Sequence, residues 1–189
     1  MGRLSFLRAL AQDPMVASVT PTSTWAARRI VASMQVTQAS VIVEYGPGQG
    51  EVSDEIVRAM SGSARLYLIE RNAAFADQLR LRFLHDGRVR VVHADALEVR
   101  DVLRHDDVHE VDVVLSSIPF TFLSPKAARC ILEATRDILA PQGRFVMFQF
   151  TPKATLLVRK YFKIKRMKLL VRNLPPLLLT VAEKLLAKV

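Results

Sequence analysis

The fold of this chain is decided by one stretch, Val43-Glu44-Tyr45-Gly46-Pro47-Gly48-Gln49-Gly50. It joins an apolar, β-branched run, which predicts a buried strand, to a segment that predicts a helix. The three glycines let the backbone turn sharply and approach a ligand without a Cβ in the way. The helix start behind them presents free N–H groups to a polar ligand. The spacing differs from the dinucleotide-binding pattern, and a tight strand-to-helix turn without a ligand is the alternative.

Strands and helices alternate on both sides of this turn. Buried strands alternating with helices at this rhythm predict a single Rossmann-like α/β domain, whose mostly parallel, doubly wound, seven-stranded sheet has helices on both faces. The strands are expected at 40–44, 65–70, 89–93, 111–116 and 144–150, and the helices at 24–34, 51–60, 73–83, 97–104, 125–139 and from Pro152 to about Tyr161.

The two ends of the chain are less regular. Gly2–Gln12 predicts an amphipathic helix with leucines at spacing three, which acts as a lid or as a membrane contact. We therefore divide the chain into N-terminal helices over 1–36 and a catalytic domain over 37–189. Near the other end, Lys165–Arg172 and Leu177–Glu183 predict a final pair of strands, or a helix in place of the second strand.

Composition narrows the class of protein. A length of 189 residues suits one domain. The net charge of +9 predicts attraction to nucleic acid or to an anionic membrane. Mean hydropathy is +0.19, yet no run approaches the about 18 apolar residues of a spanning helix, and the N-terminus does not resemble a signal peptide. We expect a cytoplasmic, monomeric protein that associates peripherally with a membrane.

Cysteine and histidine offer no metal site. The single cysteine, Cys130, excludes an internal disulfide and is expected to be a buried thiol. The histidines at 85, 93, 105 and 109 are scattered among acidic and loop-like residues, without zinc-ligand spacing. We therefore expect no metal cofactor.

Two acidic positions give the glycine turn its context. Glu70 ends the second strand, where a carboxylate can accept both hydroxyls of a ribose. Asp95-Ala96 follows the third strand, where an acid can accept a hydrogen bond from an adenine amino group. All these features lie at carboxyl ends of strands, so they predict one ligand crevice where the strand order reverses.

Over residues 40–150 this arrangement resembles the class I S-adenosylmethionine (SAM)-dependent methyltransferases. The resemblance implies that SAM is the cofactor and S-adenosylhomocysteine the product. It implies that Glu44 faces the methionine amino group, that the glycines line methionine and ribose, and that Glu70 holds the ribose hydroxyls. It also implies the remaining cofactor contacts, which are Thr22, Ser23, Gly46, Gly48, Gly50, Arg71, Asp95, Ala96 and Ser116.

The fourth strand ends in Ser116-Ser117-Ile118-Pro119-Phe120, where that family places the methyl acceptor. Methyl transfer needs alignment and a lone pair more than a strong acid or base. We therefore assign Ser116, Ser117, Pro119 and Phe120 to catalysis. Phe120 can stabilise a cationic amine by a cation–π contact. The alternative is that Phe120 and Phe122 only pack the crevice wall.

Two families share the glycine motif and a related fourth-strand turn. The ribosomal RNA adenine N6-dimethyltransferases carry Asn-Leu/Ile-Pro-Tyr/Phe there, and Ser117 occupies the position of their asparagine. We also expect the chain to end before their additional helical RNA-binding domain. RNA adenine methylation is therefore the alternative function, and a non-catalytic SAM-binding module is the second alternative.

Nearly the whole chain resembles the bacterial phospholipid N-methyltransferases. The segments that carry this resemblance are 13–23, 117–120, 149–152 and 172–176. This resemblance implies stepwise methylation of phosphatidylethanolamine to phosphatidylcholine by an enzyme bound to anionic membranes. It implies that Phe120, Phe122, Arg172 and Asn173 bind the substrate. Leu177–Leu179 departs from the aromatic and basic residues expected after the double proline. The base that takes the amine proton is water, the lipid phosphate or Tyr161.

Overall fold

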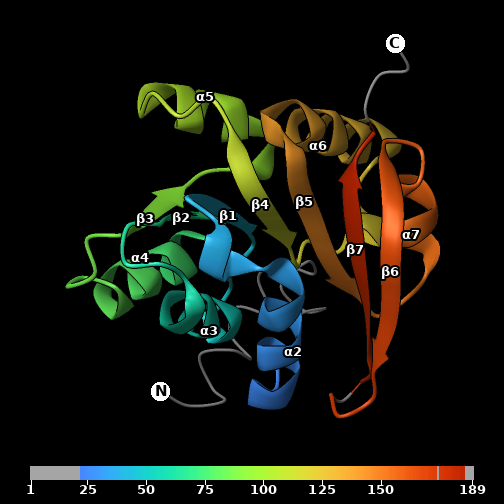
Figure 1. Cartoon of the computed structure of the whole chain (residues 1–189), viewed down its shortest axis with the longest axis horizontal. Coiled ribbons are helices and arrows are strands. Elements are labelled where there is room, and N and C mark those ends of the chain that lie inside the picture. Colours follow the sequence, from blue (N-terminus) through green and yellow to red (C-terminus); the bar gives the residue numbers. More distant parts are fainter. Residues whose placement is uncertain (1–21, 174, 186–189) are drawn as a thin grey trace.

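The alternation of strands and helices predicted from the sequence is present in the computed structural model, which describes residues 22–173 and 175–185 (Figure 1). Several bounds match the expectation to the residue, among them those of the helix after Ser23 and of the second to fourth strands. The elements are α2 Thr24–Met34, η2 Val36–Gln38, β1 Val41–Tyr45, α3 Glu51–Ala59, β2 Arg65–Glu70, α4 Ala73–Arg82, β3 Val89–His93, η3 Ala96–Glu98, α5 Val99–His105, β4 Val111–Ser116, η4 Phe120–Phe122, α6 Pro125–Ile138, β5 Leu139–Gln149, α7 Lys153–Val158, β6 Phe162–Leu170 and β7 Leu177–Lys184.

The strands form one seven-stranded sheet in the order β3-β2-β1-β4-β5-β7-β6. Strands β1 to β5 pair in parallel, and β7 runs antiparallel to both of its neighbours, β5 and β6. The chain therefore adds β2 and β3 on one side of β1 and then returns to place β4 on the other side. This reversal puts the loops after β1 and β4 next to each other, which confirms the predicted doubly wound fold.

Helices cover both faces of the sheet, each over its own apolar layer. On one face α5, α6 and α7 bury side chains against β1, β4 and β5, with Tyr45 and Phe145 at the centre of the layer. On the other face α2 and α3 bury side chains such as Ile30 and Ile56 against the sheet. Central strands buried on both faces explain the continuous apolar runs of the sequence.

The last third of the chain differs most from expectation. β5 begins at Leu139, not at Arg144, because Leu139 already pairs with Val111 of β4. The final segment is a strand, and the helical alternative is wrong. Leu177, Leu179 and Val181 alternate into the α2 side of the sheet while β7 pairs with β5. That pairing satisfies the backbone of β5, which would otherwise be an open edge.

Three further predictions concern the N-terminal segment and Cys130. The helix expected over 2–12 lies outside the described residues. Of the segment 1–36, helix α2 packs on the sheet through Ala26, Ala27 and Ile30. Cys130 lies on α6 and is half-buried, and not buried as expected.

Candidate active site

The turn after β1 holds all three of its glycines in the left-handed region. Gly46, Gly48 and Gly50 have φ angles of +68°, +59° and +87°. A Cβ on Gly46 would lie 3.1 Å from the Ser117 hydroxyl, and one on Gly50 would lie 2.9 Å from a methyl of Leu79. A Cβ on Gly48 would meet nothing within 4 Å. The outer two glycines therefore allow close packing, whereas the middle one faces space that a ligand can enter.

Glu70 supports this turn from the end of β2. Its side chain is buried, and its two oxygens accept backbone N–H bonds from Gly48, at 3.0 Å, and from Asn72, at 2.8 Å. Burial raises the pKa of the Glu70 carboxyl, and these N–H groups oppose the rise. Each oxygen keeps a lone pair that can accept a further hydrogen bond, as the predicted contact with ribose hydroxyls requires.

Glu44 is the more deeply buried of the two carboxyls, with 1% of its surface exposed. The Ser53 hydroxyl, one turn into α3, donates to it at 2.6 Å. Burial raises the pKa of Glu44 from its ordinary value of 4.5 to about 8, and the nearby carboxylates of Glu51 and Glu70 add to the rise. The site thus holds a carboxyl that is largely neutral at pH 7 and that a nearby cation would ionise.

Asp95 caps the short helix η3 behind β3. Its side chain accepts the Leu97 N–H at 2.9 Å, while Glu98 accepts the Asp95 N–H at 2.8 Å. The Ala94 N–H donates to the Glu70 carbonyl at 3.1 Å, so Asp95 lies beside the end of β2. Ala96 is buried, and Arg71 is exposed beside the turn. The cap explains the Asp95 position, and its role toward adenine stays a prediction.

The turn after β4 is bonded directly to the glycine turn. The Ser117 hydroxyl donates to the Gly46 carbonyl at 2.5 Å and lies 3.2 Å from the Tyr45 carbonyl, to which the Ser117 N–H also donates. Ser116 is fully buried, and its hydroxyl accepts the Ile118 N–H at 3.3 Å. Both hydroxyls therefore hold the backbone of the turn, and this role had not been predicted for either.

The two phenylalanines of this segment differ in exposure. Phe120 is buried within the apolar layer, which favours the packing role among the two that the sequence left open. Phe122 is 63% exposed. Pro119 starts the short helix η4, which contacts α7. A direct contact between Phe120 and an amine would require this layer to open.

Tyr161 is not brought to the site. It precedes β6, whose first residue, Phe162, pairs with Lys184. The Lys184 ammonium bonds the carbonyl of Leu139, the first residue of β5. Tyr161 therefore lies toward the amino-terminal edge of the sheet, opposite the Ser117 turn, because α7 carries the chain back across the sheet. The structure therefore does not bring Tyr161 together with the acceptor turn, and its role as the base, one of three that the sequence left open, is not supported by this placement.

Arg172 and Asn173 lie in the connection between β6 and β7, where they meet the start of α2. The Asn173 side chain accepts the Ser23 N–H at 2.9 Å and donates to the Pro175 carbonyl at 3.0 Å. The Ser23 hydroxyl donates to the Arg172 carbonyl at 3.1 Å. The guanidinium of Arg172 lies 5.6 Å from the ring centre of Trp25. These contacts, with the buried Thr22 beside them, hold the connection in place.

Two residues of the site were given no role from the sequence, although the second lies in the segment 149–152 that carries the family resemblance. One is Ser53. The other is Gln149, whose amide donates to the carbonyls of Ile118 and Phe148, both at 2.8 Å, and so fixes the acceptor turn from the end of β5. A polar residue at the end of a buried strand was the available signal for Gln149. Ser53 sits in a helix rich in charged residues, where nothing distinguishes it.

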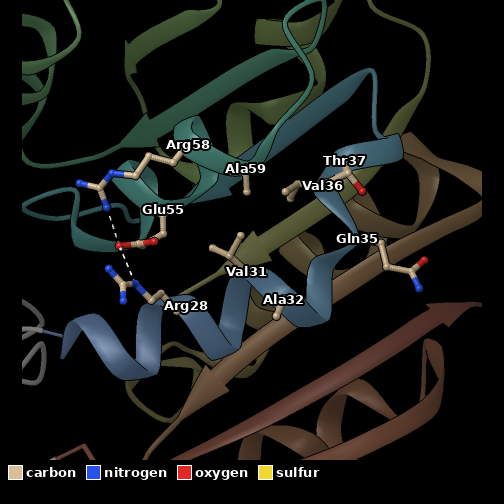
Figure 2. A pocket seen from close by; sticks show the side chains of 9 residues that line it. All are labelled: Arg28, Val31, Ala32, Gln35, Val36, Thr37, Glu55, Arg58 and Ala59. Atoms are coloured by element: carbon tan, nitrogen blue, oxygen red, sulfur yellow. Dashed lines mark hydrogen bonds and ion pairs between the residues drawn. The ribbon is translucent and has the colours of Figure 1, made fainter.

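A groove elsewhere on the molecule contains none of the predicted site residues (Figure 2). It has a volume of about 370 Å³ and lies between α2, η2 and the C-terminal half of α3, before β1 begins. Glu55 lies in it between Arg58, at 2.5 Å, and Arg28, at 3.5 Å. Its lining residues are Arg28, Val31, Ala32, Gln35, Val36, Thr37, Glu55, Arg58 and Ala59.

The donors and acceptors at the carboxyl ends of β1, β2 and β3 fit SAM. An open side of the glycine turn, a braced carboxylate and an acidic helix cap follow three adjacent strands, β1, β2 and β3. The buried carboxyl of Glu44, at the end of β1, can ionise and pair with a positively charged group of a ligand. Within 22–173 and 175–185, no group of three acidic, histidine or cysteine side chains could hold a metal ion.

Comparison with known proteins agrees with this geometry. Residues 42–143 match a family model described as a methyltransferase domain. An ornithine lipid N-methyltransferase from Singulisphaera acidiphila is 28% identical over 162 residues, which are 85% of this chain and 84% of that protein. A ribosomal RNA small subunit methyltransferase A from Parasynechococcus marenigrum is 28% identical over 119 residues, but the chain spans only 38% of its length.

A solved structure shares the fold. The N-methyltransferase NodS from Bradyrhizobium japonicum, in complex with S-adenosyl-L-homocysteine, has a TM-score of 0.69 and 13% identity, with 96% of this chain and 97% of that one covered. At this identity the likeness concerns the fold alone.

Proposed function

This chain belongs to the family of methyltransferase domains and is a SAM-dependent methyltransferase, and we propose that it methylates the amine of phosphatidylethanolamine and its methylated derivatives at a membrane surface. The observation that carries the proposal is the extent of its similarity to a lipid N-methyltransferase, which spans 84% of that relative. The product of repeated transfer would be phosphatidylcholine.

Bound SAM supplies an electrophilic methyl group on a sulfonium. On transfer to an amine, an N–C bond would form from the amine lone pair while the S–C bond breaks and leaves its electron pair on sulfur, so that S-adenosylhomocysteine would be released. The protein contributes alignment. Ser117 and Gln149 hold the acceptor turn against the glycine turn through the Gly46 and Ile118 carbonyls. The cofactor side rests on Glu44, Glu70 and Asp95.

The amine must lose a proton before it has a lone pair to offer. The turn 116–123 contains no histidine or carboxylate, and Tyr161 lies at the other edge of the sheet. Water or the lipid phosphate therefore takes the proton in our proposal.

One observation favours a second candidate, an rRNA adenine N6-methyltransferase. Ser-Ile-Pro-Phe follows β4 here, and a ribosomal RNA methyltransferase matches 63% of this chain. A non-catalytic SAM-binding module is the third candidate, and it would use the same glycine turn and Glu70.

Methyl transfer from labelled SAM separates these candidates. The full chain is incubated with liposomes containing phosphatidylethanolamine and, separately, with ribosomal RNA. We expect label in the lipid amine and none in RNA. The matched control is Glu70→Ala, which removes the support of the glycine turn and should weaken SAM binding and labelling together. Label in RNA alone would overturn the lipid proposal, and label in neither would favour the binding module.

A further inference from the structure

The hairpin of β6 and β7 ends close to the acceptor turn. β6 runs parallel to β5, so its last residues lie at the carboxyl edge of the sheet. There Leu169 pairs with Leu178, which pairs with Gln149, whose amide bonds the Ile118 carbonyl. In Figure 1 the hairpin (orange and red) extends past the arrowhead of β5. We call residues 166–172 the hairpin tip.

Large apolar side chains are exposed on this tip. Met167 is 42% exposed, Leu169 57% and Val171 64%. Three more lie on segments that end at the same edge or contact the acceptor turn, namely Phe122, Phe150 and Leu156. Such a group of exposed apolar side chains marks a surface that another apolar phase covers.

The tip is also strongly basic. The sequence has no aspartate or glutamate between Asp137 and Glu183. Lys165, just before the tip, pairs with Glu183 at 3.1 Å, whereas Arg166 and Lys168 form no ion pair with an acidic side chain among the described residues. The register places Arg166 and Lys168 on the face of Val181 and Leu179, and Met167 and Leu169 on the face of Thr180 and Leu178.

We propose that the hairpin tip docks the enzyme on an anionic lipid bilayer, with Met167, Leu169 and Val171 inserted among the headgroups and the flanking cations on lipid phosphates. Because β6 is the edge strand, side chains of both faces reach a plane that touches its tip. Insertion of apolar side chains flanked by cations is how peripheral proteins bind anionic leaflets. The inference rests on the proposed function, and it names the surface that presents the acceptor turn to the lipid.

The chemistry of the tip favours a bilayer over RNA. The exposed apolar side chains of residues 166–172 are aliphatic, with aromatic rings only on the neighbouring Phe122 and Phe150, whereas single-stranded RNA is bound chiefly by aromatic rings on which bases stack. The cations of the tip can bind phosphates of either a bilayer or RNA. The exposed apolar side chains are therefore the feature that favours a bilayer.

Vesicle binding by matched variants tests the proposal. The full chain, the apolar variant Met167→Ser/Leu169→Ser/Val171→Ser and the charge variant Arg166→Gln/Lys168→Gln are sedimented with vesicles of equal parts phosphatidylcholine and phosphatidylglycerol. The control, Leu81→Ser/Leu84→Ser, removes exposed leucines from the α4 segment, on the opposite side of Figure 1. We expect partition to fall at least about ten-fold in both tip variants and to stay unchanged in the control.

Activity on a monomeric short-chain phosphatidylethanolamine separates docking from chemistry. The tip variants should keep wild-type turnover there, which also shows that they fold, and lose turnover on vesicles. Unchanged vesicle binding in both tip variants would overturn the docking surface. The proposal would also be overturned if the tip variants kept vesicle binding and lost binding to RNA. If the wild type binds vesicles through the tip but labels no lipid, the proposed function fails and the docking surface stands.

Discussion

The buried carboxyl of Glu44 shows how one residue links cofactor binding to pH. Its side chain accepts a hydrogen bond from the Ser53 hydroxyl, and burial raises its pKa to about 8. The predicted neighbour, the methionine ammonium, would favour the ionised form. Burial in the fold therefore favours the neutral form of Glu44, and a cation beside it would favour the ionised form.

We predict that Glu44→Gln removes a pH dependence of stability. The folded state raises the pKa of Glu44 from 4.5 to about 8. The folded chain thus holds a proton that the unfolded chain releases, and the stability it contributes is lost as pH rises through this window. Thermal unfolding without ligand should show the variant several degrees more stable than wild type above about pH 8, with no such gain near pH 4.5.

The exposed Glu110→Gln is the matched control for this prediction and should unfold as wild type does at every pH. Parallel pH profiles of Glu44→Gln and wild type would mean that Glu44 is ionised in the fold.

At the scale of elements, the site depends on contacts between segments far apart in sequence. The N-terminus of α2 is bonded to the β6–β7 connection through Ser23 and Asn173, which are 150 residues apart. Trp25 lies between the guanidiniums of Arg29 and Arg172, each 5.6 Å from its ring centre. These contacts position the start of α2 beside the hairpin tip, on the acceptor side of the sheet.

We predict that Asn173→Ala loosens this junction. Asn173 is 3% exposed, and its loss leaves the Ser23 N–H without that acceptor, which costs about 1–3 kcal/mol. Urea unfolding measures the change. Asn173→Asp keeps the acceptor for the Ser23 N–H, but it loses the donor to the Pro175 carbonyl and adds a buried carboxyl, so it should also lower stability, and more so at neutral than at acid pH. Equal stability of wild type and Asn173→Ala would show that the bond contributes nothing.

At the scale of the whole molecule, charge and topology coincide. The net charge is +9, and the long segment without acidic residues includes the whole edge strand β6. The parallel sheet brings the carboxyl ends of its strands to one edge, and the hairpin tip lies at that same edge. No helix among residues 22–173 and 175–185 has the length and apolar character to cross a membrane.

We predict that binding to anionic vesicles weakens with salt while SAM binding does not. Exposed cations are screened beyond about 3 Å at 1 M salt and beyond about 10 Å at 0.1 M. Partition to phosphatidylglycerol vesicles should therefore fall at least about ten-fold over this range. SAM affinity, measured by calorimetry in the same buffers, should change little because Glu44 and Glu70 are buried. Salt-independent partition would contradict the role of charge.

Much of the fold could be predicted because its signals are local. Buried β-branched runs, helix caps such as Ser23 and Asn72, and the glycines after β1 act within a few residues of themselves. A strand followed by such a turn and a helix forces parallel pairing, and parallel pairing brings the strand ends together. The sequence alone thus determined the doubly wound sheet and the crevice with Glu44, Glu70 and Asp95.

What only the tertiary structure decided depends on where distant segments meet. Tyr161 lies at the far edge because α7 returns the chain across the sheet, and Phe120 is buried because the helix layer above it is complete. Ser53 and Gln149 support the site through hydrogen bonds to Glu44 and to the Ile118 carbonyl, which lie 9 and 31 residues away in the sequence. The last segment became a strand because β5 offered it an unpaired edge. Local pattern cannot report such contacts, since their free energy exists only once both partners are in place.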